Sequence, residues 1–180
     1  MVLLVGGSGL EEAPRSVSQL YSAAPQLREA ARRLADKRRE VVGGQAGALY
    51  LTVREFAVSH SQDSKVEMLG TDNLGNNVAL VVRNPGTGST LLAHVDRLTN
   101  ECLESMTAAL AGQQYQACTS RLQLSIVGAF QDSKNVSQSL LIPILGKQTL
   151  NSIQKRTILS LQKFENPELP PILETINLAI

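Results

Sequence analysis

LGTDNLGNNVALVVRNPGTGSTLLAHVD, residues 69–96, predicts a strand, a tight turn and a second strand that runs back beside the first. Apolar residues fill positions 78–82 without a break, which is typical of a mostly buried strand. The turn reads PGTG at residues 85–88. Proline fixes φ there and glycine tolerates positive φ, so the chain can reverse direction and continue from Ser89.

This hairpin would gather polar side chains at one end. An antiparallel return brings the segment that precedes the first strand toward the end of the second strand. That segment contains Thr71 and Asn77, and the second strand ends on His94, Val95 and Asp96. Convergent polar groups at one end of a buried hairpin predict a functional site.

Five segments of the chain resemble, in order and spacing, the protein N-terminal asparagine amidohydrolases. They are LYLTVREFAV, LGTD, VALVVRN, TLLAHVD and RLQLSIVGAF, and the similarity covers roughly residues 3–145. The resemblance implies hydrolysis of the side-chain amide of an N-terminal asparagine to aspartate, which feeds the N-degron route to ubiquitination. It also implies an α+β fold with mostly antiparallel β-sheet layers and flanking helices, a deamidase-like sandwich.

The family is similar in turn to bacterial chemoreceptor glutamine deamidases, in which a cysteine, a histidine and a threonine form the site. Where the family carries an acidic-Ala-Thr-Thr-Cys run, residues 73–77 of this chain read NLGNN, so Asn77 falls on the cysteine's position. Thr71 and His94 match the threonine and the histidine of that site, and Asp96 matches the acidic residue after the histidine. A carboxamide lacks the nucleophilicity of a thiolate, so the resemblance predicts a site retained in shape and impaired in hydrolysis.

Three functional hypotheses follow. The first is a degenerate family member that binds an N-terminal asparagine through Thr71, Asn77 and His94 without cleaving it. The second is an active deamidase that uses Cys118, or a water polarised by His94 and Asp96. The third is a non-catalytic interaction module, or a truncated isoform, that meets a protein partner through a basic helix or an apolar tail.

Composition limits the function classes. At 180 residues the chain suits one domain, and 43% hydrophobic with 18% charged residues is ordinary for a soluble protein. A net charge of +1 argues against broad binding to nucleic acid. No apolar run approaches the roughly 18 residues of a membrane span. Cys102 and Cys118 lack metal-ligand spacing and fit a reducing compartment, so we expect a cytoplasmic protein, with the nucleus also possible.

Neither a cofactor nor a metal is expected. The GGSG run at residues 6–9 lacks the full glycine spacing of a dinucleotide site and has no helix directly after it, so an edge strand entering a surface loop is favoured. His60 lies among serine, glutamine and aspartate without a second ligand nearby in sequence, and is interpreted as an exposed turn residue.

Flanking elements are expected on both sides of the hairpin. Residues 25–40 predict a helix whose basic face is most simply solvated, and residues 98–111 predict a helix that turns Cys102 toward the core. Strands are expected at residues 48–58, 65–69 and 121–130, the last with either a bulge or a close backbone approach at Gly128. A short helix from Ser137 should stop at Pro143 and Gly146.

The resemblance fades from about residue 145. We therefore divide the chain into an amidohydrolase-like domain at residues 1–145 and a divergent helical tail at residues 146–180, with the C-terminal part of the family fold absent. Residues 148–164 predict a helix, and three prolines and an apolar end follow. An exposed apolar tail would favour partner binding.

Overall fold

A computed structural model of the chain describes residues 3–5, 8–10, 12, 14–36, 46–62, 65–111, 122–128, 136–146 and 157–162. The helices are α1 (Val17–Ala23), α2 (Gln26–Ala35), α3 (Asn100–Ala111) and α4 (Val136–Ile144). The strands are β1 (Leu3–Val5), β2 (Ser8–Leu10), β3 (Ala48–Leu51), β4 (Phe56–Ser59), β5 (Met68–Thr71), β6 (Val78–Asn84), β7 (Ser89–Val95), β8 (Leu122–Gly128) and β9 (Thr157–Gln162).

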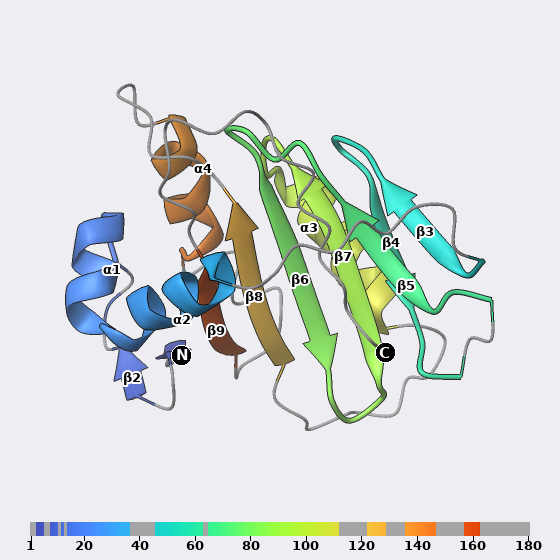
Figure 1. Cartoon of the computed structure of the whole chain (residues 1–180), viewed down its shortest axis with the longest axis horizontal. Coiled ribbons are helices and arrows are strands. Elements are labelled where there is room, and N and C mark those ends of the chain that lie inside the picture. Colours follow the sequence, from blue (N-terminus) through green and yellow to red (C-terminus); the bar gives the residue numbers. More distant parts are fainter. Residues whose placement is uncertain are drawn as a thin grey trace.

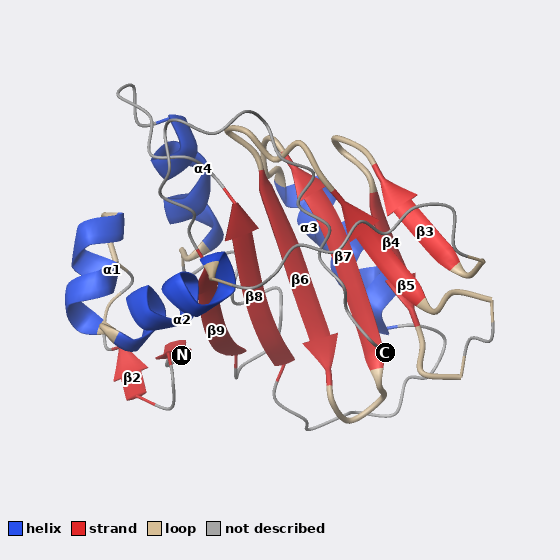
Figure 2. Cartoon of the chain, viewed as in Figure 1, coloured by secondary structure: helices blue, strands red, loops and turns tan. Residues whose placement is uncertain are grey.

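The described strands form a large and a small sheet. The large sheet has seven strands in the order β2-β1-β9-β8-β6-β7-β4, and β3 pairs with β5 in a separate two-stranded sheet (Figure 1). Four of the pairings in the large sheet are antiparallel, and the two made by β9 are parallel. With helices beside the sheet (Figure 2), this is the expected α+β class with a mostly antiparallel sheet.

The central hairpin forms as predicted. β6 and β7 pair in register from Val78 opposite Val95 to Asn84 opposite Ser89. Gly88 closes the turn with φ of +71°, and its N–H donates to the Asn84 carbonyl at 2.8 Å. Every residue of β7 is buried, so the returning strand lies in the interior of the molecule.

The two faces of the central strands pack against different partners. Val78, Leu80 and Val82 join a large hydrophobic cluster that includes buried residues of all four helices. Ala79 and Val81 face the other way, into a smaller cluster that includes Leu51 and Leu69 of the small sheet. Strand alternation therefore points one face of these central strands toward the large cluster and the other toward β3 and β5.

The single strand predicted for residues 48–58 is wrong. The chain forms β3, turns through residues 52–55, and enters the large sheet as β4 beside β7. Arg54 adopts φ of +70°, and the Glu55 carboxylate accepts the Thr52 N–H at 2.6 Å. Polar residues in the middle of the run supply a local turn that competes with a continuous strand.

The helix predicted for residues 148–164 is also wrong over its described part. Residues 157–162 form β9, which lies parallel between β8 and β1. A short apolar run such as TILSLQ does not distinguish strand from helix by periodicity, and pairing on both edges decides the outcome. Residues 147–156 and 163–180 lie outside the described part, and the domain boundary at residue 145 stays a prediction.

Two features near the N-terminus differ from the prediction, namely a helix that was not expected and the position of β1 in the sheet. α1 was not predicted; its N-terminal Ser16 hydroxyl accepts the Gln19 N–H at 3.1 Å, which caps the helix. Of the glycine run, the described residues 8 and 9 belong to β2, in which Ser8 pairs with Val5 of β1. β1 is therefore flanked on both sides instead of lying at the edge.

No helix within the described residues is long and apolar enough to cross a membrane.

Candidate functional site

The site lies where β3, β5 and β7 end and β6 begins, at the upper edge of the sheets in Figure 1. Thr71 is the last residue of β5, His94 lies near the end of β7, and Asn77 directly precedes β6. His94 follows the alternation of Leu92, so its side chain turns toward the small sheet and away from the helices. The fold thus brings segments from both sheets to one point.

The His94 imidazole is held between two of the predicted site residues. Its Nδ1 lies 2.8 Å from Thr71 Oγ1, and its Nε2 lies 3.2 Å from Asn77 Nδ2. His94 is 2% exposed and Thr71 is fully buried, whereas Asn77 is partly accessible. Thr71, Asn77 and His94 therefore meet, in the spatial arrangement that the hairpin predicts.

The hydrogen bonds assign the imidazole tautomer. Thr71 Oγ1 donates its single proton to the carbonyl oxygen of Leu51 at 2.9 Å. Leu51 is the register partner of Thr71 in the small sheet. The hydroxyl must then accept at its second contact, so His94 Nδ1 carries the hydrogen. In a neutral imidazole this leaves a lone pair on Nε2, and Asn77 Nδ2 donates to it.

Burial lowers the pKa of His94, and the negative charges of Asp72 and Asp96 partly oppose that effect. The ring is therefore neutral at neutral pH. A neutral ring with its lone pair on Nε2 is a proton acceptor, and that acceptor faces residue 77. The geometry provides a base aimed at the side chain of position 77.

A tight loop and a glycine place Asn77. Gly75 has φ of +42° and the Asn77 N–H donates to the Leu74 carbonyl, which folds the segment before β6 into a turn. Gly128 of β8 has φ of +100°, and a Cβ there would lie 2.8 Å from Leu74 Cδ1 and 3.1 Å from the Asn77 carbonyl oxygen. The close backbone approach expected at Gly128 is confirmed, and it is an approach to the site.

Asp96 pairs with Arg54, and both ring nitrogens of His94 contact other residues. Asp96 Oδ2 accepts from Arg54 Nε at 2.8 Å and lies 2.7 Å from another guanidinium nitrogen. The hydrogen bond from Arg54 holds the pKa of Asp96 below its usual range. Backbone bonds between residues 54–55 and His94 tie the same turn to β7. Asp96 therefore anchors the turn over the site instead of contacting His94.

Comparison with known proteins identifies the family. A family model described as protein N-terminal asparagine amidohydrolase matches residues 38–166. Proteins named protein N-terminal asparagine amidohydrolase from Mus musculus and Homo sapiens are each 34% identical to the chain over 149 residues, and one from Sus scrofa is 33% identical over 148. The chain belongs to this family. Each alignment covers 82% of the chain but 47% of the relative, so the chain spans about half the length of these curated relatives.

Sequence analysis of this amidohydrolase family member did not single out two residues that lie near the site, Asp72 and Tyr50. Asp72 follows Thr71 directly and is partly buried, and Tyr50 lies in β3, the strand that pairs with β5. Partial desolvation, together with the Asp72 carboxylate, raises the pKa of Tyr50 to about 12. Asp72 stands in the LGTD segment that carries the family resemblance, so its position offered a signal, whereas Tyr50 reaches it only through the pairing of β3 with β5.

Within the described residues of this amidohydrolase family member, no thiol lies beside His94. Cys102 of α3 packs against the large hydrophobic cluster, on the opposite face of the sheet from the imidazole. Burial raises the pKa of its thiol, as expected for a cysteine turned toward the core. Cys118 lies outside the described residues.

In the described part of the chain, no group of three or more histidine, cysteine, aspartate or glutamate side chains could hold a metal ion. His60 is exposed, and its Nδ1 lies 2.8 Å from the hydroxyl oxygen of Ser89. The predicted exposure of His60 is therefore confirmed.

Proposed function

We propose that the chain binds the N-terminal asparagine of a protein or peptide and hydrolyses its side-chain amide poorly or not at all. The contact of 3.2 Å between Asn77 Nδ2 and His94 Nε2 carries this proposal. Nε2 is the atom that would take a proton from a nucleophile, and a carboxamide donates to it without becoming nucleophilic. The family membership supports the substrate class, and the residue at position 77 supports the impairment.

The contrast with a thiol defines the missing step. A cysteine at position 77 would give its proton to Nε2, and the thiolate would attack the side-chain carbonyl carbon of the substrate. Ammonia would leave, with a proton returned by the imidazole, and water would hydrolyse the resulting thioester to give aspartate. Thr71 would hold the imidazole in the required tautomer during these steps.

Restoring the nucleophile tests the proposal. An Asn-initiated peptide is incubated with the chain, with Asn77→Cys and with Asn77→Ala, and conversion of amide to acid is followed by mass spectrometry. We expect conversion by Asn77→Cys alone, because Asn77→Ala removes the carboxamide without supplying sulfur. Robust turnover by the unaltered chain would contradict the impairment, and an inactive Asn77→Cys that still binds the peptide would place the defect elsewhere.

An active deamidase with another nucleophile is the alternative within the same family. A water activated by His94 would have to displace Asn77 from Nε2, which disfavours that version. The thiol version predicts that Cys118→Ala abolishes turnover. Unchanged turnover in that variant would remove Cys118 as the nucleophile.

The cellular setting belongs to the same proposal. The substrates would be protein N-termini that begin with asparagine, in the cytoplasm or nucleus, within the N-degron route to ubiquitination. The name of the relatives supports an action on N-terminal asparagine, and two cysteines without metal-ligand spacing in the sequence fit a reducing compartment.

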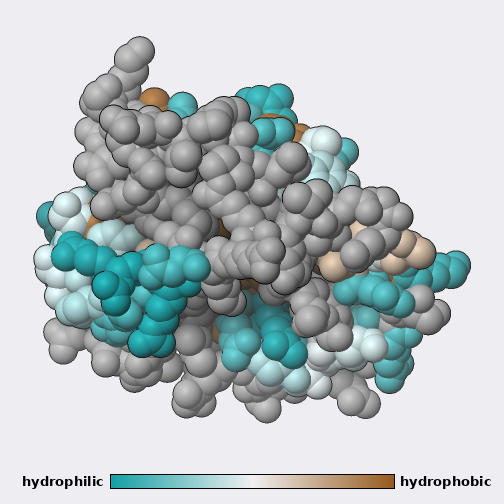
Figure 3. Space-filling model, viewed as in Figure 1, coloured by the Kyte–Doolittle hydropathy of each residue, from teal (hydrophilic) through white to brown (hydrophobic). Residues whose placement is uncertain are grey.

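The described part of the basic helix, up to residue 36, gives no support to the interaction-module hypothesis, and residues 37–40 of the predicted helix lie outside the described part. Arg32 and Arg33 of α2 both pair with Glu29, at 3.3 Å and 3.2 Å, and Arg28 lies over the Tyr21 ring. The hydrophilic surface at the left of Figure 3 covers this part of the molecule, as expected for a solvated helix face. A role for the tail remains testable by pull-down, comparing the full chain with one that ends after β9.

A further inference from the structure

The turn between β3 and β4 ends in a bulge opposite His94. The Arg54 N–H donates to the His94 carbonyl at 2.9 Å, and the His94 N–H donates to the Glu55 carbonyl, also at 2.9 Å. Regular pairing of β4 with β7 begins one residue later, with Phe56 opposite Ala93. Two residues of one strand therefore oppose a single residue of the other, which is the arrangement of a β-bulge.

Arginine occupies the position in this bulge that glycine usually takes. Arg54 has φ of +70°, and the Glu55 N–H donates to the Thr52 carbonyl at 3.1 Å, which closes the turn. A bulge whose first residue is left-handed is typically built on glycine, because a side chain is strained in that conformation. Such strain persists only where the surrounding structure holds it, and it clusters at functional sites. We therefore looked for what the arginine side chain contacts.

The guanidinium of Arg54 connects the bulge to the end of β7. Its Nε lies 2.8 Å from Asp96 Oδ2, and another of its nitrogens lies 2.7 Å from the same oxygen. Asp96 stands two residues after His94, so the ion pair and the two backbone hydrogen bonds hold β7 on both sides of the imidazole. The Arg54 side chain is 60% exposed, and an ion pair so accessible to solvent adds little to stability. Its main effect is therefore on local geometry.

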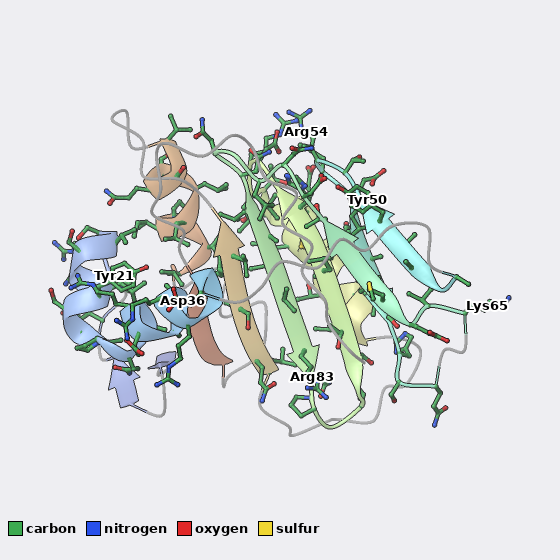
Figure 4. All side chains as sticks on the ribbon, viewed as in Figure 1. Tyr21, Asp36, Tyr50, Arg54, Lys65 and Arg83 are labelled. Atoms are coloured by element: carbon green, nitrogen blue, oxygen red, sulfur yellow. The ribbon has the colours of Figure 1, made fainter. Side chains whose placement is uncertain are left out.

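The same turn also reaches the other side of the imidazole. The carbonyl of Leu51, three residues before Arg54, accepts from Thr71, whose hydroxyl in turn accepts from His94 Nδ1. The second ring nitrogen lies 3.2 Å from Asn77 Nδ2. Figure 4 shows Arg54 at the upper end of the sheets, where these contacts lie. A shift of the turn would therefore move the ring relative to both of its neighbours.

We propose that Arg54 is a positioning residue, whose guanidinium locks the bulge onto Asp96 and thereby sets where His94 Nε2 lies relative to residue 77. The arginine acts through the backbone of His94 and does not touch the imidazole. The inference rests on the proposed function only for the part of Nε2 as the proton acceptor, since the geometry itself needs no substrate.

Nitrogen-15 NMR of the imidazole tests the proposal in the absence of any peptide. The chain is compared with Arg54→Gly, which removes the guanidinium but suits the left-handed backbone, and with Arg54→Lys, which keeps the charge. In Arg54→Gly the shifts of Nδ1 and Nε2 should move toward each other as the second tautomer becomes populated. Arg54→Lys should restore part of their separation. Shifts in Arg54→Gly identical to those of the chain would overturn the proposal.

Arg32→Ala is the matched control, because Arg32 also forms an exposed ion pair, with Glu29, but lies on α2. It should leave the imidazole shifts unchanged, and both it and Arg54→Gly should unfold near the urea midpoint of the chain. If Arg54→Gly does not fold, Asp96→Ala replaces it, because that variant removes the acceptor and leaves the residues of the turn unaltered. Asp96→Ala should move the shifts in the same direction, and an unaltered spectrum there would equally contradict the role of Arg54.

An introduced thiol measures the aim of Nε2 directly. In Asn77→Cys the imidazole should take the thiol proton, so that iodoacetamide alkylates position 77 rapidly at neutral pH. Adding Arg54→Gly should slow this alkylation by roughly tenfold, equivalent to about one pKa unit, and adding Arg32→Ala should not. Peptide mass mapping separates position 77 from Cys102 and Cys118. Equal rates in the two double variants would overturn the proposal, whatever the deamidation assay shows for the proposed function.

Discussion

A single hydroxyl, that of Thr71, determines the protonation pattern of the site. It donates to a backbone carbonyl on β3 and accepts from the imidazole on β7, so it links the small sheet to the large one. Thr71 lies on β5 of the small sheet, so the hairpin register does not place it. The juxtaposition of Asn77 and His94 could be predicted from the hairpin alone, because antiparallel register determines which residues share an end. The placement of Tyr50 near Asp72 could not, because it depends on a parallel pairing between β3 and β5 that the sequence between them does not indicate.

Replacing Thr71 by valine keeps the shape and removes the hydroxyl. We expect a loss of about 1–3 kcal/mol of unfolding free energy, because the Leu51 carbonyl and the His94 N–H would each lose a buried partner. Urea denaturation gives the free energy, and the ¹⁵N shifts of the imidazole report the tautomer. Thr71→Ser retains the hydroxyl and should keep the Nδ1–H tautomer; an unaltered spectrum in Thr71→Val would refute the assignment.

Gly128→Ala should destabilise the fold by about 1–3 kcal/mol and displace Asn77. The new methyl would meet Leu74 Cδ1 at 2.8 Å and the Asn77 carbonyl oxygen at 3.1 Å, in a backbone conformation with φ of +100°. Gly75→Ala is the control, since its φ is also positive but its nearest atom lies at 3.8 Å. Equal costs for the two variants in chemical denaturation would show that backbone strain, not the contact with Leu74, makes glycine necessary.

The buried imidazole makes stability depend on pH. The pKa of His94 is lowered in the folded chain, so as pH falls below about 6.5 the unfolded chain takes up a proton first. The contribution is fully present above that pH and is lost as pH falls through the lower, folded pKa. We expect a smaller unfolding free energy at about pH 5.5 than at about pH 7.5, and a weaker decrease in His94→Gln. An equal decrease in both proteins would exclude His94 as its origin.

At the scale of elements, prediction succeeds where local pattern and tertiary pairing agree. The β6–β7 hairpin carries a turn sequence and two apolar runs, and it forms in the expected register. Residues 48–58 carry an equally strong strand pattern, yet a turn at Arg54 divides them between two sheets. The polar residues in the middle of that run were visible, but their effect depends on both flanking strands finding partners.

The small hydrophobic cluster joins these elements and supports the site. Leu69 of β5 and Leu124 of β8 are both fully buried, but Leu69 belongs to the small cluster and Leu124 to the large one. Each leucine-to-alanine change should cost about 2–5 kcal/mol. Only Leu69→Ala should also speed hydrogen exchange at the Thr71 amide beyond the global loss of stability. Equal local protection in both variants would mean that the small sheet does not depend on this cluster.

For the whole molecule, β9 decides how the sheet is completed. Within the described residues β1 and β2 connect to the rest of the sheet only through β9. The position of β9 could not be predicted, because the segment TILSLQ carries no signal that identifies β1 and β8 as its neighbouring strands. The division of the chain at residue 145 would separate one strand of the large sheet from the others.

A chain ending at residue 146 should therefore unfold at a lower urea concentration and with a smaller dependence on urea, because less surface is buried. A chain ending at residue 162 keeps β9 and should match the full chain more closely. Proteolysis of residues 1–14 in the shorter chain gives an independent measure of whether the first hairpin is still held. Identical denaturation curves for the two truncated chains would show that β9 adds nothing to stability.

The parallel contact between Leu4 and Ile158 spans about 150 positions of sequence. At a synthesis rate of about 5–20 residues per second, the opening hairpin would wait roughly 8–30 s on the ribosome before its partner strand emerged. During that interval its free edge would be open to pairing with other nascent chains. This amidohydrolase family member would therefore need a chaperone, or slow dilution on refolding, more than its modest size suggests.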